Sequence, residues 1–475
     1  MEFLVVVKRD CETCQMVGPV LASLKASLPL MLYSQDDPAF PEEAGGARDD
    51  RGLEESWRRK IEVVPTVIRI EDGNEVERTE GWDRAEWERI TGQGGLGAGL
   101  PDFKPGCGSR SAEFGMPERL SLQFGGMHLA SREVEVGETE DPMEVAYDRG
   151  WTDGLPIVPP TDLRIARMLS GTTRKSDEII GLIPPNLAEC TIEKVAISAV
   201  MAGCRPEYMP VVLAVVEAAL KPQFSMHGLL ATLGFAGPVV IVNGPITKRI
   251  GMNSKGNALG QGNRANAAIG RTLQLLVRNM GGGIPQEIDR SVLGNPGKYT
   301  FCFAEDEDDE DWVPLNVARG AKPGTSTVTL FHGDGVQGCV AWHSRTPEEV
   351  SRSLAMSLLS VCHPKACQWS KAMLVLCPDH YKIFQQHGWG RHELEAGLRD
   401  ALKRPGHDLI RGAHGVSEGI DPARAEEIVD KFHEEDGLLV VRAGGKGAGQ
   451  SAIIGGWPAQ RKVDEIKIVS EEVGT

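Results

Sequence analysis

Two cysteines near the start of the chain, Cys11 and Cys14, have a Cys-x-x-Cys spacing. In such a pair one thiol can attack a substrate and the other can close a disulfide that releases it. A strand is expected over residues 1–8 and an apolar-periodic helix over residues 16–28. The motif therefore lies at a helix N-terminus, where unpaired N–H groups and the helix dipole lower a thiol pKa from about 8.5 toward neutrality. The sequence predicts an attacking thiolate near pH 7.

The residues around this motif leave other interpretations open. Asp10 and Glu12 flank Cys11, and their negative charges oppose thiolate formation. A buried pair or a zinc-binding pair is the structural alternative, but a zinc site needs two further ligands and none stands nearby. We expect no metal here.

A third cysteine, Cys107, lies in a Gly-rich segment over residues 105–111. It has little to pack against, so we expect an exposed thiol, with Lys104 and Arg110 favouring its thiolate. It is either an incidental loop cysteine or a reactive thiol that exchanges with the Cys-x-x-Cys pair. The preceding flexible stretch, residues 95–101, would make that exchange intramolecular, at an effective concentration on the order of mM.

Polar side chains in the second half of the chain are suited to binding a small anion. They surround a Gly-rich loop and the start of a helix expected over residues 264–279, and the candidates are Asn253, Asn263, Arg264 and Arg271. The two arginines are seven residues apart and share a helix face. Amides and guanidinium groups in such a place suit a carboxylate or phosphate, unless the amides only hold the loop to itself.

Three further segments are weaker candidates. The Gly-rich loop over residues 444–449, with Lys446 beside it, could cradle an anion through its backbone N–H groups. Seven consecutive acids, residues 305–311, lack the spacing and glycine of a calcium loop, and we expect a solvated surface loop there. Cys362 and Cys367 have no matching pair elsewhere, so a metal site is not expected.

The elements that must position these residues are those of an α/β protein. The first 95 residues predict the order β-α-β-α-β-β-α, with strands over 1–8, 28–33, 63–70 and 75–78 and helices over 16–28, 53–60 and 84–91. The later chain alternates helices over 162–169, 191–202, 209–220, 264–279, 347–362 and 391–402 with strands over 238–245, 326–332, 372–377 and 437–442. Strands that end in polar or Gly-rich loops place ligand sites at their C-terminal ends.

Length and composition limit the remaining possibilities. A chain of 475 residues predicts two or three domains, here residues 1–95, a Gly/Pro-rich linker over 96–140 that carries Cys107, and a substrate-binding region over 141–475 that could divide near 310–325. The net charge of -16 argues against nucleic acid and anionic membranes as partners. No run of 18 apolar residues occurs, and ten dispersed cysteines fit a reducing compartment, so we expect a soluble cytoplasmic protein.

Residues 1–95 resemble the thioredoxin family. The resemblance rests on Cys11-Glu12-Thr13-Cys14, on Pro19 five residues after the second cysteine, on Val64-Pro65-Thr66, and on the closing hairpin and helix. It implies a thioredoxin fold in which Cys11 is the nucleophile, Cys14 resolves the disulfide and Pro65 is cis. It also implies a redox-active Cys11–Cys14 disulfide that needs no other cofactor.

The region that begins at residue 105 resembles an uncharacterised group of (seleno)proteins named for a Sec-Gly-Ser-Cys tetrad, the UGSC family. The resemblance lies in Gly106-Cys107-Gly108-Ser109 and at residues 153–161, 193–210, 243–245 and 295–301. The resemblance implies that Cys107 occupies the selenocysteine position. Because Arg110 replaces the final Cys of the tetrad, a resolving thiol must come from elsewhere, and the Cys-x-x-Cys pair is the expected donor.

These observations predict an enzyme, a thiol-dependent oxidoreductase. Its Cys11/Cys14 module would reduce Cys107, which acts on a small-molecule substrate bound in a larger α/β region that follows the thioredoxin fold. An external thiol reductant or a thioredoxin reductase-like donor would recycle the module, and a homo-oligomer is compatible with the sequence. The alternatives are a thiol-dependent lyase or hydrolase that the module keeps reduced, and a non-enzymatic partner of protein disulfides.

Overall fold

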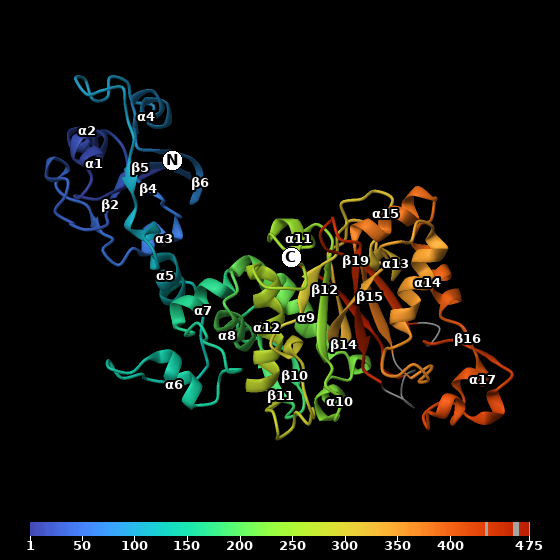
Figure 1. The fold of residues 1–475 in the computed structure, drawn as a ribbon. Coiled ribbons are helices and arrows are strands. Elements are labelled where there is room, and N and C mark those ends of the chain that lie inside the picture. Colours follow the sequence, from blue (N-terminus) through green and yellow to red (C-terminus); the bar gives the residue numbers. More distant parts are fainter. Residues whose placement is uncertain (370, 433–435, 459–464, 475) are drawn as a thin grey trace. The chain divides into compact units, whose positions relative to one another are not determined.

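The computed structural model describes residues 1–369, 371–432, 436–458 and 465–474. The chain divides into two compact units, Met1–His128 and Leu129–Thr475 (Figure 1), and each is described by itself. Both units combine helices with mixed sheets, so the predicted α/β class is confirmed.

The smaller unit has short elements around one central sheet. Its strands are β1 (Glu2–Val7), β2 (Leu30–Ser34), β3 (Arg48–Asp49), β4 (Val63–Val64), β5 (Thr66–Glu71), β6 (Asn74–Glu80), β7 (Trp82–Asp83), β8 (Phe103–Lys104) and β9 (Cys107–Gly108). Its helices are α1 (Glu12–Met16), α2 (Gly18–Ser27), α3 (Glu54–Arg58), α4 (Arg84–Thr91) and α5 (Met116–Phe124).

The sheet of the smaller unit has the order β3-β2-β1-β5-β6. Strand β1 pairs in parallel with β2 and antiparallel with β5, which pairs antiparallel with β6. Five consecutive buried residues, Phe3 to Val7, let β1 occupy the centre because both of its faces are covered. Trp82 and Trp87 complete the core with an edge-to-face contact, their ring centroids 5.0 Å apart.

The helix expected over residues 16–28 is two helices. It begins earlier, at Glu12, and Val17 separates α1 from α2. Pro19 lies in the first turn of α2, where the N–H that it lacks is not needed, so the chain restarts the helix there. Cys11, directly before Glu12, is the N-cap of the first helix.

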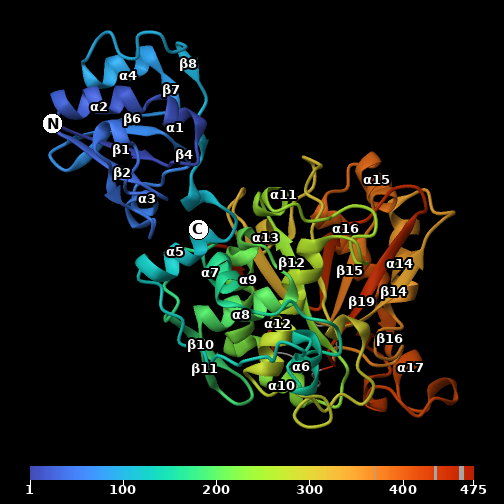
Figure 2. The ribbon, with the colours of Figure 1, turned by 90° about the vertical axis from the view of Figure 1, so that its left-hand side faces the viewer.

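The predicted linker over residues 96–140 is not a free tether in its first part. Strand β8 pairs with β7, β9 pairs with β4, and α5 contacts α3 through the rings of Trp57 and Phe124 (Figure 2). The boundary between the units falls after His128, some thirty residues later than expected. Glycines at 95, 97 and 99 gave the appearance of a tether, but Arg84 binds the carbonyl oxygens of Leu96 and Leu100 and fixes this loop.

The helices of the larger unit lie between and around its strands. They are α6 (Pro142–Asp148), α7 (Asp162–Leu169), α8 (Ile192–Ala202), α9 (Met209–Leu220), α10 (Met226–Ala231), α11 (Ile246–Arg249), α12 (Arg264–Asn279), α13 (Leu315–Ala318), α14 (Pro347–Leu358), α15 (Pro378–Gln386), α16 (Arg391–Ala401) and α17 (Gly406–Leu409). Three of them, α7, α9 and α12, have the bounds that the apolar periodicity predicts.

The strands of this unit form one main sheet and two small pairs. They are β10 (Ile179–Ile183), β11 (Ala188–Thr191), β12 (Gly237–Asn243), β13 (Cys302–Ala304), β14 (Thr327–Val340), β15 (Ala372–Leu376), β16 (Arg404–Pro405), β17 (Ile428–Val429), β18 (Leu438–Arg442), β19 (Gln450–Gly456) and β20 (Val469–Glu472). The main sheet has the order β13-β12-β14-β19-β15-β18, with β20 paired to β14.

The long strand β14 joins the two halves of this sheet. Its first half pairs with β12 and β20, and its second half pairs with β19 after an irregularity between Gly333 and Val336. Helices α9 and α12 lie beside β12, β13 and β14, and α14, α15 and α16 lie beside β15, β18 and β19 (Figures 1 and 2). Because β12 and β14 pair directly, the sheet continues through the region around residues 310–325 where a division was considered.

The acidic run does not form the solvated loop that we expected. Glu305 and Asp306 are buried, and Glu305 accepts hydrogen bonds from Trp312 and from the backbone N–H of Leu315. Burial raises the pKa of the Glu305 carboxyl, against the charge of Arg391. Further cations, Arg442, Lys255 and Lys248, pair with other acids of the run. A sequence window of acids alone does not reveal these partners, since all of them come from other segments.

Candidate thiol site

The Cys-x-x-Cys pair lies where β1 gives way to α1. Cys11 is the N-cap of α1, and its sulfur accepts the backbone N–H of Cys14 at 3.4 Å. Both side chains are buried, with 2% of Cys11 and 0% of Cys14 exposed. All the cysteines that the structure describes are free thiols, these two included.

The loop between β4 and β5 packs against Cys11. The Val64–Pro65 peptide bond is cis, as the resemblance implies. The Cys11 sulfur lies 3.6 Å from the carbonyl oxygen of Val64, to which its thiol can donate when protonated. Cys11 therefore faces the residue that precedes the cis proline.

Cys107 lies beside Cys11 because β9 pairs with β4. The pairing is antiparallel and sets Cys107 opposite Val64 and Gly108 opposite Val63. It continues beyond the strands, since the Ser109 N–H donates to the Glu62 carbonyl at 2.8 Å. Cys107 is half-buried and packs against the core that contains Cys11 and Cys14.

Side chains far away in the sequence hold this segment in place. The Thr13 hydroxyl, inside the Cys-x-x-Cys motif, donates to the Pro105 carbonyl at 2.7 Å. Buried Gln35, directly after β2, donates to the Ser109 hydroxyl at 2.6 Å and accepts the Arg110 N–H at 3.0 Å. Lys104 forms an ion pair with Glu12 at 3.2 Å. These contacts fix the backbone on both sides of Cys107.

The segment approaches its neighbours so closely that a glycine is required at 106. A Cβ atom there would overlap the Val63 side chain and lie 2.6 Å from the Val64 carbonyl oxygen. On the other side, a Cβ at Gly81 would lie 2.7 Å from the Gly106 nitrogen. At Gly108, by contrast, an added Cβ meets nothing within 4 Å. The space for β9 therefore depends on Gly106 and not on Gly108.

The three thiols have different pKa values. Hydrogen bonds accepted from Cys14, and then from Cys107 and the backbone N–H groups of Cys14 and Thr13, lower the pKa of Cys11 to about 5, although burial acts in the opposite direction. Burial, together with donation to Cys11, raises the pKa of Cys14 far above its usual value. Burial and the bond to Cys11 also raise the pKa of Cys107. At neutral pH the group is one thiolate held by two thiols.

Two expectations are corrected here. The flanking acids do not keep Cys11 protonated, because Glu12 points into solvent and is paired with Lys104, and Asp10 is also exposed. Cys107 is not an exposed thiolate: it is half-buried, and burial together with donation to Cys11 raises its pKa.

Sequence reasoning missed three positioning residues: Thr13, Gln35 and Gly106. Thr13 lies between the two cysteines but binds a carbonyl 92 positions away. Gln35 and Ser109 are separated by 74 positions. The one local signal was the glycine before Cys107, whose close approach to β4 the sequence does not specify.

The residues expected to bind an anion in the larger unit are bonded within the chain. Asn263 caps α12 through the Asn266 N–H and donates to the Gly251 carbonyl, and Asn253 donates to Gly256. Arg271 forms a bidentate ion pair with Asp153, at 2.7 and 2.8 Å. Arg264 donates to the Gly203 carbonyl. The two arginines share a helix face, but each is bonded to a different part of the chain.

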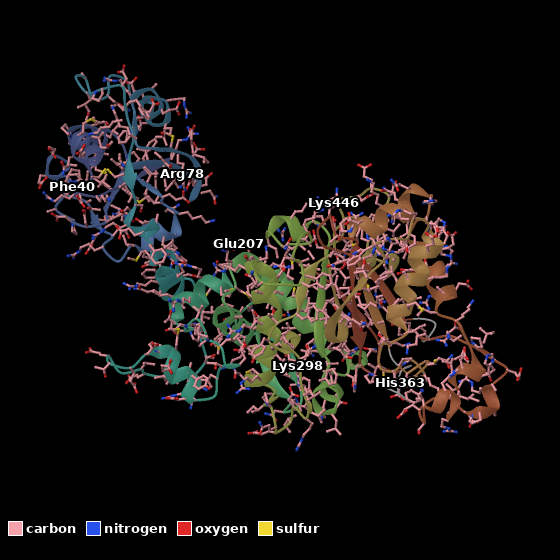
Figure 3. The ribbon with its side chains drawn as sticks, in the orientation of Figure 1. Phe40, Arg78, Glu207, Lys298, His363 and Lys446 are labelled. Atoms are coloured by element: carbon pink, nitrogen blue, oxygen red, sulfur yellow. The ribbon has the colours of Figure 1, made fainter. Side chains whose placement is uncertain are left out.

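The Gly-rich loop around Lys446 does bind an anion through its backbone N–H groups, but this anion is the carboxylate of Asp379 in the same chain. The backbone N–H groups of Gly447, Ala448 and Gly449 all donate to one Asp379 carboxylate oxygen, at 2.7 to 3.0 Å. The same loop pairs with the segment that follows Asn253, through Lys255 and Gly444. Lys446 itself is exposed, and Figure 3 shows it toward the end of the sheet opposite Lys298.

Comparisons with known proteins add no relative to this description. No family model, no curated protein and no solved structure matches the chain. Within the described residues, no three His, Cys, Asp or Glu side chains are grouped so that they could hold a metal ion. None of the helices that the structure describes has both the length and the apolar character needed to cross a bilayer.

Proposed function

We propose that the protein is a thiol-dependent oxidoreductase in which Cys11 and Cys14 reduce Cys107 within the same chain. The observation that carries the proposal is the pairing of β9 with β4, which sets Cys107 opposite Val64 and beside the sulfur of Cys11. A thiolate held against a second cysteine by a backbone ladder is arranged for thiol–disulfide exchange. The substrate of Cys107 is a small molecule that accepts two electrons.

The smaller unit acts in this proposal as a thioredoxin-like module. The support is the central strand order β2-β1-β5-β6, with one parallel and two antiparallel pairings, the Cys-x-x-Cys at the start of α1, and the cis proline beside it. The UGSC-like tetrad supplies the second part, since its Cys107 occupies β9. In this proposal the module reduces a cysteine of its own chain in place of an external disulfide.

The steps balance for a small disulfide as substrate. The Cys107 sulfur attacks the disulfide, its proton passes to the Cys11 thiolate, and one half of the substrate leaves as a thiolate. Cys11, after losing that proton to solvent, attacks the Cys107 sulfur and releases the other half. Cys14 then attacks Cys11, which forms the Cys11–Cys14 disulfide and returns Cys107 as a thiol. An external dithiol, or a thioredoxin reductase-like donor, restores both thiols.

A trapping experiment with the full chain tests this sequence of steps. The Cys14→Ser variant is treated with one equivalent of 2-hydroxyethyl disulfide and mapped by mass spectrometry under non-reducing conditions. We expect the Cys11–Cys107 disulfide to accumulate, because the thiol that resolves it has been removed. Cys362→Ser, which changes an exposed cysteine of the larger unit, is the matched control and should leave the Cys11–Cys14 disulfide as the product.

The result that contradicts the proposal is equally specific. If Cys11 and Cys107 each keep a 2-hydroxyethylthio group as a mixed disulfide, with no bond between the two cysteines, Cys107 is not a substrate of the module. If turnover of the small disulfide survives Cys107→Ser unchanged, the module acts on external disulfides directly.

A further inference from the structure

The larger unit contains a cavity whose lining includes none of the three cysteines of the thiol site. Its volume is about 850 Å³, within the range of small-molecule sites. Its walls come from the first residues of the unit, 129–136, and from α6, the Pro-rich segment before α7, α8, and the end of α12. All of these segments belong to one unit, so the cavity is a feature of that unit alone.

The lining of this cavity is mostly apolar. Val134, Val145, Trp151, Ile157, Ile197 and Met201 are among the side chains that face it. Protein interiors are close-packed, and a well-fitting apolar molecule gains dispersion contacts with apolar walls. The cavity therefore favours an apolar occupant.

The buried carboxylate in the wall, Glu193, already accepts hydrogen bonds from the backbone. Glu193 is 2% exposed, and its two carboxylate oxygens accept the backbone N–H groups of Ala130 and Ser131 at 2.8 and 2.9 Å. These bonds fix the segment 129–136 over α8. Since both oxygens of Glu193 have partners, the wall does not call for a cationic ligand at this point.

One polar atom of the wall has no partner. The hydroxyl oxygen of Ser131 is buried and forms no hydrogen bond in the described structure. Other polar groups of the wall are bonded: Ser198 donates to the Lys194 carbonyl, and Asn279 donates to the Trp151 carbonyl. Neighbouring atoms cover this oxygen, so it is not accessible to a molecule in the cavity.

We propose that this cavity is a binding site for an uncharged, mainly apolar small molecule. The site is distinct from the amide-and-arginine loop, whose polar groups are bonded within the chain. That the molecule is the substrate of Cys107 rests on the proposed function; its binding does not.

The test uses Nile red as the probe and a series of primary alcohols as competitors, with the full chain. Nile red should bind saturably, and 1-butanol to 1-octanol should displace it with an affinity that rises about fourfold for each added methylene.

Two tryptophan substitutions on α6 locate the site. Val145 lines the cavity, whereas Met143, on the same helix, is 41% exposed and does not. Val145→Trp should fill the space and reduce probe binding at least tenfold, and Met143→Trp should leave it unchanged. Equal effects of the two variants, or no saturable binding to the unmodified chain, would overturn the proposal.

The same experiment separates this proposal from the proposed function. The Cys107→Ser chain should bind the probe and the alcohols as the unmodified chain does, since Cys107 lies outside the unit that holds the cavity. If the probe binds but the Cys14→Ser chain accumulates no Cys11–Cys107 disulfide, only the proposed thiol relay is wrong. A working trap with no probe binding means that the cavity alone is not a site.

Discussion

The thiol site of the smaller unit and the amide-and-arginine loop of the larger unit are built from reactive and polar residues alike, yet they differ in how those residues are used. In the loop, Asn263 caps a helix and Arg271 is paired with Asp153, so their bonding capacity is spent within the chain. At the thiol site, the surrounding bonds lower the pKa of Cys11 to about 5, and burial together with the bond to Cys11 raises the pKa of Cys107. Residue type suggests both sites, but only the thiol site holds a group in a reactive state.

The most damaging change at the thiol site should be Gly106→Ala, which tests whether the position of Cys107 is what makes that site different. A Cβ at 106 meets the Val63 side chain and the Val64 carbonyl, so β9 must leave β4. We expect formation of the Cys11–Cys107 disulfide in the Cys14→Ser background to fall at least about tenfold, measured by mass spectrometry. Reduction of the disulfides of added insulin should rise, because β9 no longer covers β4.

Gly108→Ala is the matched control for this change. It alters the same two-residue strand, but its Cβ meets nothing within 4 Å. Disulfide formation should be unchanged within error. If both alanine variants behave alike, the fit of Gly106 against β4 does not control the exchange.

Next in size, Asp153→Ala tests whether Arg271 is structural. The two side chains are only 11% and 14% exposed, and removal of the acid leaves the guanidinium without its partner charge. We expect the larger unit to lose about 3 kcal/mol of unfolding free energy, measured by urea denaturation. Lys446→Ala, at an exposed position, should change it by less than about 0.5 kcal/mol. If Asp153→Ala leaves the unfolding free energy unchanged, Arg271 again becomes a candidate contact for a ligand.

A smaller effect is expected for Asp379→Ala, which empties the N–H cradle of the loop over residues 447–449. Three backbone donors lose a charged acceptor, at a cost of about 2 kcal/mol. Added acetate should restore part of the thermal stability of this variant and not of the unmodified protein. If acetate stabilises both equally, the cradle is open to external anions and the contrast between the two sites weakens.

The finest test compares the thiols by pH. Thiolate absorbance at 240 nm should fall around pH 5 as Cys11 takes up its proton, and Cys11→Ser should abolish that step. Cys107→Ala removes a donor to the Cys11 sulfur, and loss of a bond that favours the charged form raises the pKa, so the step should move to higher pH. A step that stays in place would mean that Cys107 does not bond to the Cys11 thiolate.

Local sequence signals predicted much of the framework correctly. The helices Asp162–Leu169, Met209–Leu220 and Arg264–Asn279 begin and end at the expected residues, because apolar periodicity and capping are properties of neighbouring residues. The strands β8 and β9 were not predicted. They are two residues long, contain a Lys or a Gly, and exist only because β7 and β4 supply their hydrogen-bonding partners.

By itself the sequence determined that Cys11 and Cys14 lie at the start of a helix that follows a strand, since that depends on residues within one short window. Only the tertiary structure decided that Cys107 lies against them, that Asn263 and Arg271 are bonded to the chain, and that the acids from 305 onward are partly buried. The physical reason is common to all three. Whether a polar group or thiol remains available depends on which distant segment satisfies it, and that pairing is a property of the fold.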